Sequence, residues 1–337
     1  MKIMHLLISG YGSKDQASGR NDTAGIFDTC NEKFIFKSGI SGISFMCSSD
    51  KYFFGAGEHG GSGLVYMFSK DGSDSLLLDT LEITGGGLCH IAYSCKHNIL
   101  TGACYENGDV FSVAINDDKF GEICSYIPQR DEKEEVSRAH CVVFSPDENY
   151  LYVANIAFDR IYEYEIENGR LKETRYAQLD KGVGPRHLLH TGKEIYVITE
   201  YSNEIITLCP DDLKVINRID TLPDGYTEKS YCSTLCLSSA GYLYAANRGS
   251  NTIAVFKRND NGDLTKKHDC SCLGDWPRHI ALIGGTDDTG KDCDDPKLLI
   301  TNQNSNQMVI CSLNPDGSLG EKVLDLSFDG VSYADHF

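Results

Sequence analysis

The sequence predicts an all-β fold, a seven-bladed β-propeller built from four-stranded antiparallel blades. Two observations support this prediction: a strand pattern that recurs about every 48 residues, and turn residues between the strands with no amphipathic helix among them. The 33 Gly, 18 Tyr and 14 Phe, against 8 Pro, suit many short strands joined by tight turns. A chain of 337 residues suggests either two domains or one repetitive architecture. The repeat favours the second, a single propeller domain over residues 1–337.

The repeated unit is an apolar segment that ends on a small or polar anchor residue. Clear copies end at positions 155, 199, 247 and 302, and weaker copies end at 10, 57 and 104. The spacing between successive ends runs from 44 to 55 residues, so seven copies fill the chain. Closure of such repeats into a ring protects the sheet edges. We expect the segment 323–328 to supply an outer strand that completes one blade together with the N-terminus.

Charge and cysteine content narrow the class of protein. A net charge of −18 argues against a surface for nucleic acid or for an anionic membrane, and no apolar stretch is long enough to span a bilayer. The 14 cysteines follow no recognisable secretory leader, because the apolar run 4–8 is too short, so reduced thiols in a cytoplasmic protein are expected. Paired Cys and His ligands at zinc spacing are lacking, and we predict neither a metal nor a cofactor.

The phase of the repeat brings polar residues to one mouth of the central channel. The innermost strand of a blade and the next strand run antiparallel, so the start of the first lies beside the end of the second. Strand starts carry Cys89-His90, His140, Arg186 and Arg278, and strand ends carry Glu58, Tyr105, Glu200, Arg248 and Gln303. Residues from different blades are therefore predicted to converge on one funnel.

Two matching Pro-Arg-His segments, 185–187 and 277–279, stand out in so acidic a chain. Each arginine could simply pair with an Asp of a neighbouring blade, but the repetition of the motif favours a functional site. His187 and His279 follow the arginines and by strand alternation should face the other way, as packing residues between blades. Glu200 taken alone would be a solvated rim residue. Its phase places it at the mouth with Arg186.

Four segments carry a resemblance to a known family. They are Gly184-Pro185-Arg186-His187-Leu188 with Tyr196–Glu200, His140-Cys141 with Tyr152–Asn155, Ala246–Asn251, and Pro277-Arg278 with Thr301–Ser305. Together they resemble the lactonase family, which includes propeller-type 6-phosphogluconolactonases and the fungal 3-carboxy-cis,cis-muconate lactonizing enzymes. The resemblance is strongest over residues 85–315. It implies a seven-bladed propeller whose catalytic residues are His140, Arg186 and Glu200.

The resemblance also implies a reaction, the metal-free hydrolysis of 6-phosphogluconolactone to 6-phosphogluconate in the pentose phosphate pathway. Either Glu200 or His140 would activate water, with the other orienting it or protonating the leaving oxygen. Arg186 would stabilise the oxyanion, and Arg248 and Arg278 would hold a phosphate or carboxylate, with Asn247 beside them. The expected partner is a small anionic substrate, and the expected state is a monomer or weak homo-oligomer.

Two other functions remain open from the sequence. A muconate-type lactonizing isomerase could use the same cations for carboxylates and the same residues to move a proton. A non-catalytic propeller that binds a ligand is the other, because propellers serve many functions.

Overall fold

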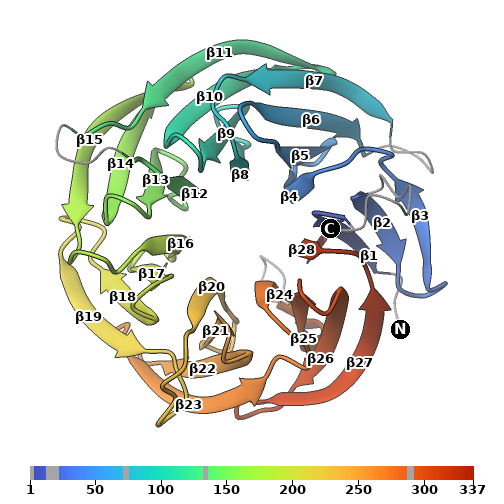
Figure 1. Cartoon of the computed structure of the whole chain (residues 1–337), viewed down its shortest axis with the longest axis vertical. Helices are drawn as coiled ribbons and strands as arrows, with labels where there is room; N and C mark the ends of the chain where they lie inside the picture. The colour runs from blue at the N-terminus through green and yellow to red at the C-terminus, as the bar shows by residue number, and fades with distance from the viewer. Residues whose placement is uncertain (1–3, 13–22, 71–75, 132–135, 287–291) are drawn as a thin grey trace.

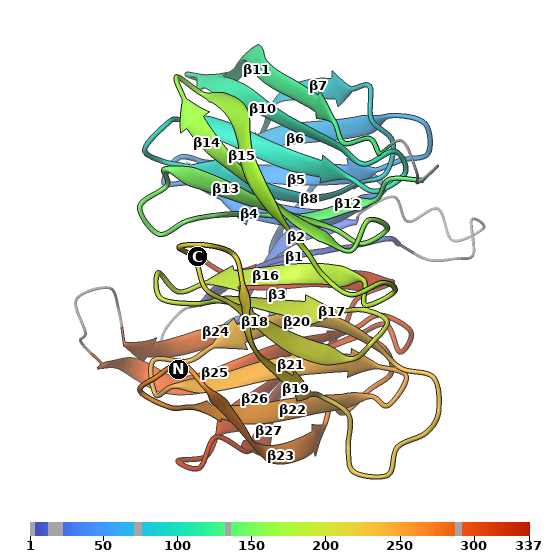
Figure 2. The ribbon, with the colours of Figure 1, turned by 90° about the vertical axis from the view of Figure 1, so that its left-hand side faces the viewer.

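The computed structural model describes residues 4–12, 23–70, 76–131, 136–286 and 292–337. These residues form seven four-stranded antiparallel sheets arranged in a ring around a central channel (Figure 1). The predicted seven-bladed propeller of four-stranded blades is therefore confirmed. In a view from the side, inner strands such as β12 (Ala139–Phe144) and β16 (Pro185–His190) run roughly along the ring axis (Figure 2).

Each blade is a run of four consecutive strands, except the blade that closes the ring. The strands, from the channel outward in each blade, are β4 (Ile43–Ser48), β5 (Tyr52–Glu58), β6 (Gly63–Ser69) and β7 (Leu77–Ile83); β8 (Leu88–Ser94), β9 (Ile99–Cys104), β10 (Asp109–Asn116) and β11 (Lys119–Pro128); β12, β13 (Tyr150–Asn155), β14 (Arg160–Glu167) and β15 (Arg170–Gln178); β16, β17 (Ile195–Thr199), β18 (Glu204–Leu208) and β19 (Val215–Asp220); β20 (Tyr231–Leu237), β21 (Tyr242–Arg248), β22 (Thr252–Arg258) and β23 (Leu264–Ser271); β24 (Pro277–Thr286), β25 (Asp292–Asn302), β26 (Gln307–Leu313) and β27 (Leu319–Ser327); and, in the closing blade, β28 (Val331–His336), β1 (His5–Gly10), β2 (Ala24–Asp28) and β3 (Lys33–Lys37).

The hydrophobic core lies between adjacent blades. Val197 of β17 packs with residues of the preceding blade, whereas the next residue, Ile198, packs with residues of the following one. Side chains of a strand point alternately to its two faces, and both faces of a propeller blade are covered. For this reason the second strands are continuously buried, as in β13 and β17.

The ring closes differently from our expectation. All of the segment 323–328 except its last residue belongs to β27, the outer strand of its own blade, and the chain then returns to the centre as β28. β28 is the innermost strand of the closing blade, where Val331 and Ala334 are fully buried. Ser332 Oγ donates a hydrogen bond to the Ser44 backbone oxygen at 2.6 Å, which links the closing blade to the next one. The sequence after position 330 fits a buried inner strand because its apolar residues can face the channel and both neighbours.

All seven inner strands carry a β-bulge near their first residue. At this point one extra residue interrupts the pairing between the innermost strand and the second strand of the blade. We call these extra residues the bulge ring: Ser44, Cys89, His140, Arg186, Ser233, Arg278 and Ser332. Bulges redirect side chains and are frequent beside active sites.

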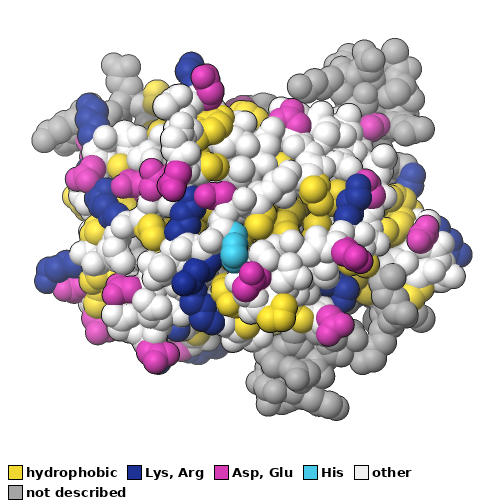
Figure 3. Space-filling model, turned by 90° about the horizontal axis from the view of Figure 1, so that it is seen from below, with side chains coloured by type: hydrophobic (Ala, Val, Ile, Leu, Met, Phe, Trp, Pro, Cys, Tyr) yellow, Lys and Arg dark blue, Asp and Glu magenta, His cyan; other side chains and the backbone are white. Residues whose placement is uncertain are grey.

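The outer surface has no dominant charge on the side drawn in Figure 3, where acidic, basic and apolar side chains are mixed. Among the described residues there is no helix with the length and apolar character needed to cross a membrane.

Candidate active site

The mouth of the channel is the end at which the inner strands begin and the second strands finish. Arg186 and Arg278 enter it from the bulges of β16 and β24, and both line a cavity of about 20 Å³ together with His140 and Tyr11. A cavity of this size has room for about one water molecule. The predicted convergence of strand starts from different blades is thus present in the structure.

Arg186, Glu200 and Arg248 form one ion cluster at this mouth. Glu200 Oε2 lies 3.1 Å from Arg186 Nε and 3.1 Å from Arg248 Nη2. The two arginine side chains are 4% and 6% exposed, and Glu200 is 17% exposed. The Nε–H of Arg186 is not aimed at the carboxylate, so this contact is ionic without being a hydrogen bond. Glu200 is therefore held between two cations.

Backbone carbonyls fix the two arginines of this cluster. Arg186 Nη1 donates to the Ser233 oxygen at 2.6 Å, and Arg248 Nη2 donates to the Cys232 oxygen at 2.8 Å. Burial, with Arg248 beside it, lowers the pKa of Arg186 to about 9, which leaves the guanidinium charged at neutral pH. The remaining N–H groups of these fixed guanidinium groups are suited to bind an anion.

A second cluster joins Arg278, Tyr11 and Glu58. Arg278 Nη2 donates to the Tyr11 oxygen, and the Tyr11 hydroxyl donates to Glu58 Oε2 at 2.6 Å. The Arg278 guanidinium also lies 4.9 Å from the centre of the Tyr11 ring. Burial raises the pKa of Tyr11, so the phenol keeps its proton. This cluster draws on the three blades that follow Arg248 around the ring.

His140 lies in the same cavity as a neutral imidazole. Burial and then the charge of Arg186 lower its pKa well below 6.5. Its Nδ1 is buried and has no hydrogen-bond partner among the described residues. No direct contact joins His140 and Glu200 among the hydrogen bonds and ion pairs of the described residues. The structure thus brings the three predicted catalytic residues to one mouth and pairs only Arg186 with Glu200.

His187 and His279 do not pack away from the arginines, which corrects our expectation. Both line the cavity with Arg186 and Arg278. The bulge at each arginine breaks the strand alternation on which the expectation depended. His279 packs on Tyr333, with ring centres 4.6 Å apart, and His187 lies 5.7 Å from the ring of His90.

The buried histidines should make the protein sensitive to acid. Burial lowers the pKa of His90 to about 3 and that of His279 to about 4, against 6.5 in the unfolded chain. The unfolded state therefore binds more protons as the pH falls below 6.5, and each of these histidines should cost about 1.4 kcal/mol of stability per pH unit down to its folded pKa. We expect His279→Gln to reduce this slope in denaturant unfolding measured between pH 6.5 and 4.5.

The matched control is His336→Gln. The hydrogen bond that the ring of His336 donates to Asp335 raises the pKa of His336, so its contribution to stability changes above pH 6.5 and not below. An unchanged acid slope in His279→Gln would mean that the ring is protonated in the folded protein.

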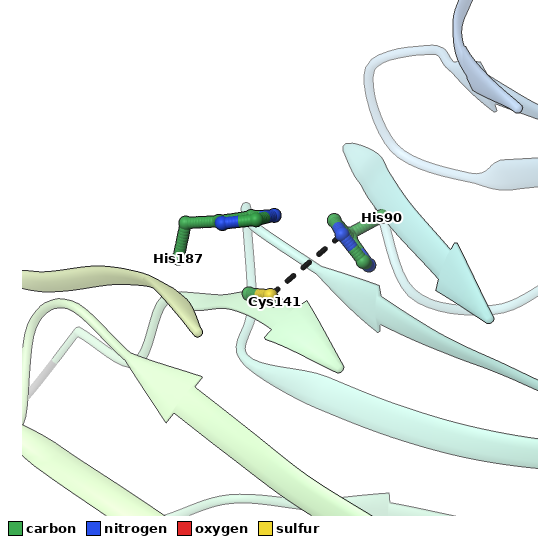
Figure 4. A group of neighbouring side chains, drawn as sticks. All are labelled: His90, Cys141 and His187. Atoms are coloured by element: carbon green, nitrogen blue, oxygen red, sulfur yellow. Dashed lines mark hydrogen bonds between the residues drawn. The ribbon is translucent and has the colours of Figure 1, made fainter. Parts of the chain in front are cut away.

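One group of soft ligands lies beside the arginines. His90, Cys141 and His187, which come from three consecutive blades, have donor atoms within 4.8 Å of one another and are the one such group of three among the described residues (Figure 4). His90 Nδ1 accepts the N–H of Val142, so the Nε2–H of the neutral ring points to Cys141 Sγ at 3.6 Å. Burial raises the pKa of the Cys141 thiol to about 12, and Arg186 lines the cavity that His90 and His187 also line. In this arrangement the thiol is hydrogen-bonded to His90.

Asn247 has a structural position, which corrects its assignment to substrate binding. Its side chain is fully buried, accepts from Thr221 Oγ1 at 2.8 Å and donates to the Thr221 oxygen at 3.0 Å and to Thr252 Oγ1 at 3.1 Å. Asn155 ends its strand in the same way and is also fully buried and hydrogen-bonded. The repeated Asn at the strand end is structural, because its side-chain amide forms hydrogen bonds with residues outside its own strand.

Sequence reasoning missed two residues of the mouth. Tyr11 directly follows β1, the same repeat position that Glu200 and Arg248 occupy in their blades, so the phase alone could have identified it. Trp276 lies 5.5 Å from the Arg248 guanidinium and has a left-handed backbone with φ of 66°. Nothing in the repeat marks Trp276, because its position depends on the bonded loop that precedes β24.

The fold and the site together define a seven-bladed β-propeller with three arginines, Arg186, Arg248 and Arg278, at one mouth of its channel. Residues 40–332 match the family described as "Lactonase, 7-bladed beta-propeller". The chain therefore belongs to the lactonase family of seven-bladed β-propellers.

Comparison with individual proteins supports the same family assignment. The chain is 28% identical over 252 residues to the 6-phosphogluconolactonase of Bacillus subtilis, a match that covers 68% of this chain and 72% of that protein. The fold is similar to the periplasmic gluconolactonase PpgL of Pseudomonas aeruginosa, with a TM-score of 0.86, 20% identity and 99% of both chains covered. It is also similar to a putative 6-phosphogluconolactonase of Bacteroides uniformis, with a TM-score of 0.85, 22% identity and all of both chains covered. At these identities the two structures show a common fold.

Proposed function

We propose that this protein is a cytoplasmic lactonase that hydrolyses 6-phosphogluconolactone to 6-phosphogluconate, as in the pentose phosphate pathway. The observation that carries the proposal is the pairing of Glu200 with Arg186 and Arg248 at a mouth that His140 and Arg278 also line. Three fixed cations beside a neutral histidine suit an anionic substrate whose reaction develops negative charge. The lactonase family and the Bacillus relative support the same reaction.

Arg186 is the proposed oxyanion stabiliser. Water attacks the lactone carbonyl carbon, and the carbonyl oxygen becomes negative in the tetrahedral intermediate. The Ser233 carbonyl and Glu200 hold the Arg186 guanidinium in place before the reaction begins. A donor that needs no reorganisation is worth more than one that must turn toward the charge.

His140 is the proposed base. It takes a proton from the attacking water and returns one to the ring oxygen when the ester bond breaks, so a single group can serve both steps. Its lowered pKa makes it a weak base in the free protein, largely through burial and through Arg186. A bound phosphate and the developing oxyanion offset the arginine charges, and His140 becomes more basic as the reaction proceeds.

Glu200 fits the role of counterion better than that of base. Two arginines already contact its Oε2, so this oxygen is engaged with cations. It holds Arg186 and Arg248 in register at the mouth. The proposed mechanism uses no metal ion or cofactor.

The direct test is hydrolysis of a panel of lactones by the purified protein, with and without EDTA. We expect turnover of 6-phosphogluconolactone that the chelator does not change. Lactonization of 3-carboxy-cis,cis-muconate without lactone hydrolysis would replace the proposal with the isomerase. No turnover of any of these compounds would identify a ligand-binding propeller.

A second prediction concerns the phosphate. Arg248 is proposed to bind it, so Arg248→Met should raise KM for 6-phosphogluconolactone by about 10- to 100-fold, the range for a lost charged hydrogen bond. The KM for glucono-δ-lactone, which has no phosphate, should change much less. Steady-state kinetics on both lactones checks this. An equal increase in KM for the two lactones would show that Arg248 does not bind the phosphate.

A further inference from the structure

Two carboxylates at the mouth have unlike surroundings. Glu200 is in contact with two arginines, whereas no Lys or Arg side chain among the described residues lies within 4.0 Å of the Glu58 carboxylate. Arg278 reaches toward Glu58 but ends on the hydroxyl of Tyr11. Tyr11 therefore lies between the Arg278 guanidinium and the Glu58 carboxylate.

Glu58 has acceptor capacity left for a ligand. A carboxylate offers about four lone-pair sites, and the one side-chain hydrogen bond to Glu58 among the described residues comes from Tyr11. Glu58 is the last residue of β5 and is half-buried, at the same repeat phase as Glu200. Tyr11 connects it to the cavity that His140 and Arg186 line. A ligand at the mouth thus meets an acceptor on this side and donors on the other.

We propose that Glu58, held by Tyr11, binds sugar hydroxyl groups and selects polyhydroxylated lactones. A hydroxyl group donates a hydrogen bond to a carboxylate, and such charge-assisted bonds are stronger than neutral ones. A muconate brings further carboxylates and no hydroxyl donors, so Glu58 would repel it. This inference rests on the proposed lactonase function and names the feature of the substrate that the site recognises.

Trp276 brings an aromatic ring next to Arg248, whose guanidinium lies 5.5 Å from the ring centre. It is half-buried near Arg248, and its left-handed φ of 66° is unusual for so large a side chain. Strained backbone of this kind persists where the surroundings impose it, often at ligand sites. An aromatic ring near hydrogen-bonding groups suits a sugar, which has both C–H and O–H surfaces.

The experiment compares two phosphate ligands that differ in their hydroxyl groups, glucitol 6-phosphate and hexyl phosphate, by isothermal titration calorimetry. We expect Glu58→Gln to weaken glucitol 6-phosphate about 10- to 100-fold and to leave hexyl phosphate unchanged. Tyr11→Phe should also weaken the binding of glucitol 6-phosphate, because Arg278 can then contact Glu58 and occupy its carboxylate oxygens. Binding is measured without turnover, so inactivity on every lactone would overturn the proposed function alone.

The matched control is Tyr152→Phe. Tyr152 donates to Glu163 at 2.9 Å, which is the same Tyr–Glu hydrogen bond on β13 and β14 away from the mouth, although here Arg175 pairs directly with the glutamate at 2.8 Å. The Tyr152→Phe substitution should change neither the affinity for glucitol 6-phosphate nor the affinity for hexyl phosphate. Equal weakening of both ligands by Glu58→Gln and Tyr11→Phe, unchanged binding of glucitol 6-phosphate, or no binding by the unaltered protein would each overturn the proposal.

Discussion

Arg186→Met is expected to lower kcat for 6-phosphogluconolactone by about 10²- to 10³-fold, the usual cost of removing one preorganised oxyanion donor. Methionine keeps much of the length of the side chain and removes its charge and all its donors. The loss should appear in kcat more than in KM, because the charge on the carbonyl oxygen exists only after water has attacked. Steady-state kinetics with the folded variant measures it.

Arg258→Met is the matched control for this variant. Arg258 donates to both oxygens of the buried Glu194, at 2.9 and 2.8 Å, in an ion pair outside the mouth. It should affect stability and leave kcat near its original value. The contradicting outcome is that both variants lose the same small amount of activity and the same amount of melting temperature. Arg186 would then be a structural ion-pair residue.

His140→Gln is expected to lower kcat by about 10²- to 10⁴-fold, the typical contribution of a general base. Glutamine is polar and close to histidine in size, but it cannot carry a proton between water and the ring oxygen. The backbone contact of His140, which accepts from Cys89 Sγ, is unaffected by the substitution. Single-turnover kinetics separates the chemical step from product release.

Glu200→Gln provides the comparison for His140. Removing this counterion leaves two buried arginines without their anion, so we expect a loss of about 3 kcal/mol of stability, measured by denaturant unfolding, with a smaller loss of kcat than in His140→Gln. If the fold remained stable and Glu200→Gln lost more kcat than His140→Gln, Glu200 would be the base.

The positions of the mouth residues could be predicted because a propeller repeats one geometry. Once the second strand of each blade is located, the residue at its end or just after it must lie at one end of the channel, as Glu58, Glu200 and Arg248 do. The same phase holds for Tyr11, whose blade is a weak copy of the repeat. Tyr11 was missed because the sequence pattern of its blade is weak, although its position in the repeat is the same.

The direction of side chains beside the channel could not be predicted in the same way. Strand alternation placed His187 and His279 opposite the arginines, and the bulges turned them into the same cavity. A bulge adds one residue to one strand of a pair, and only the pairing with the second strand reveals it. Asn247 shows the reverse case, a polar residue at a site position whose hydrogen bonds are all internal.

The sequence by itself determined the number of blades, the order of strands in every blade except the one that closes the ring, and most of the residues that meet at the mouth, since these follow from the period and phase of a local pattern. Only the tertiary structure decided the partners within that set. Glu200 contacts Arg186 and Arg248, Glu58 contacts Tyr11, and β28 rather than an outer strand closes the ring. The Glu200–Arg186 pair lies within one blade, whereas Glu200–Arg248 and Glu58–Tyr11 join residues of different blades, whose distances exist only once the ring has closed.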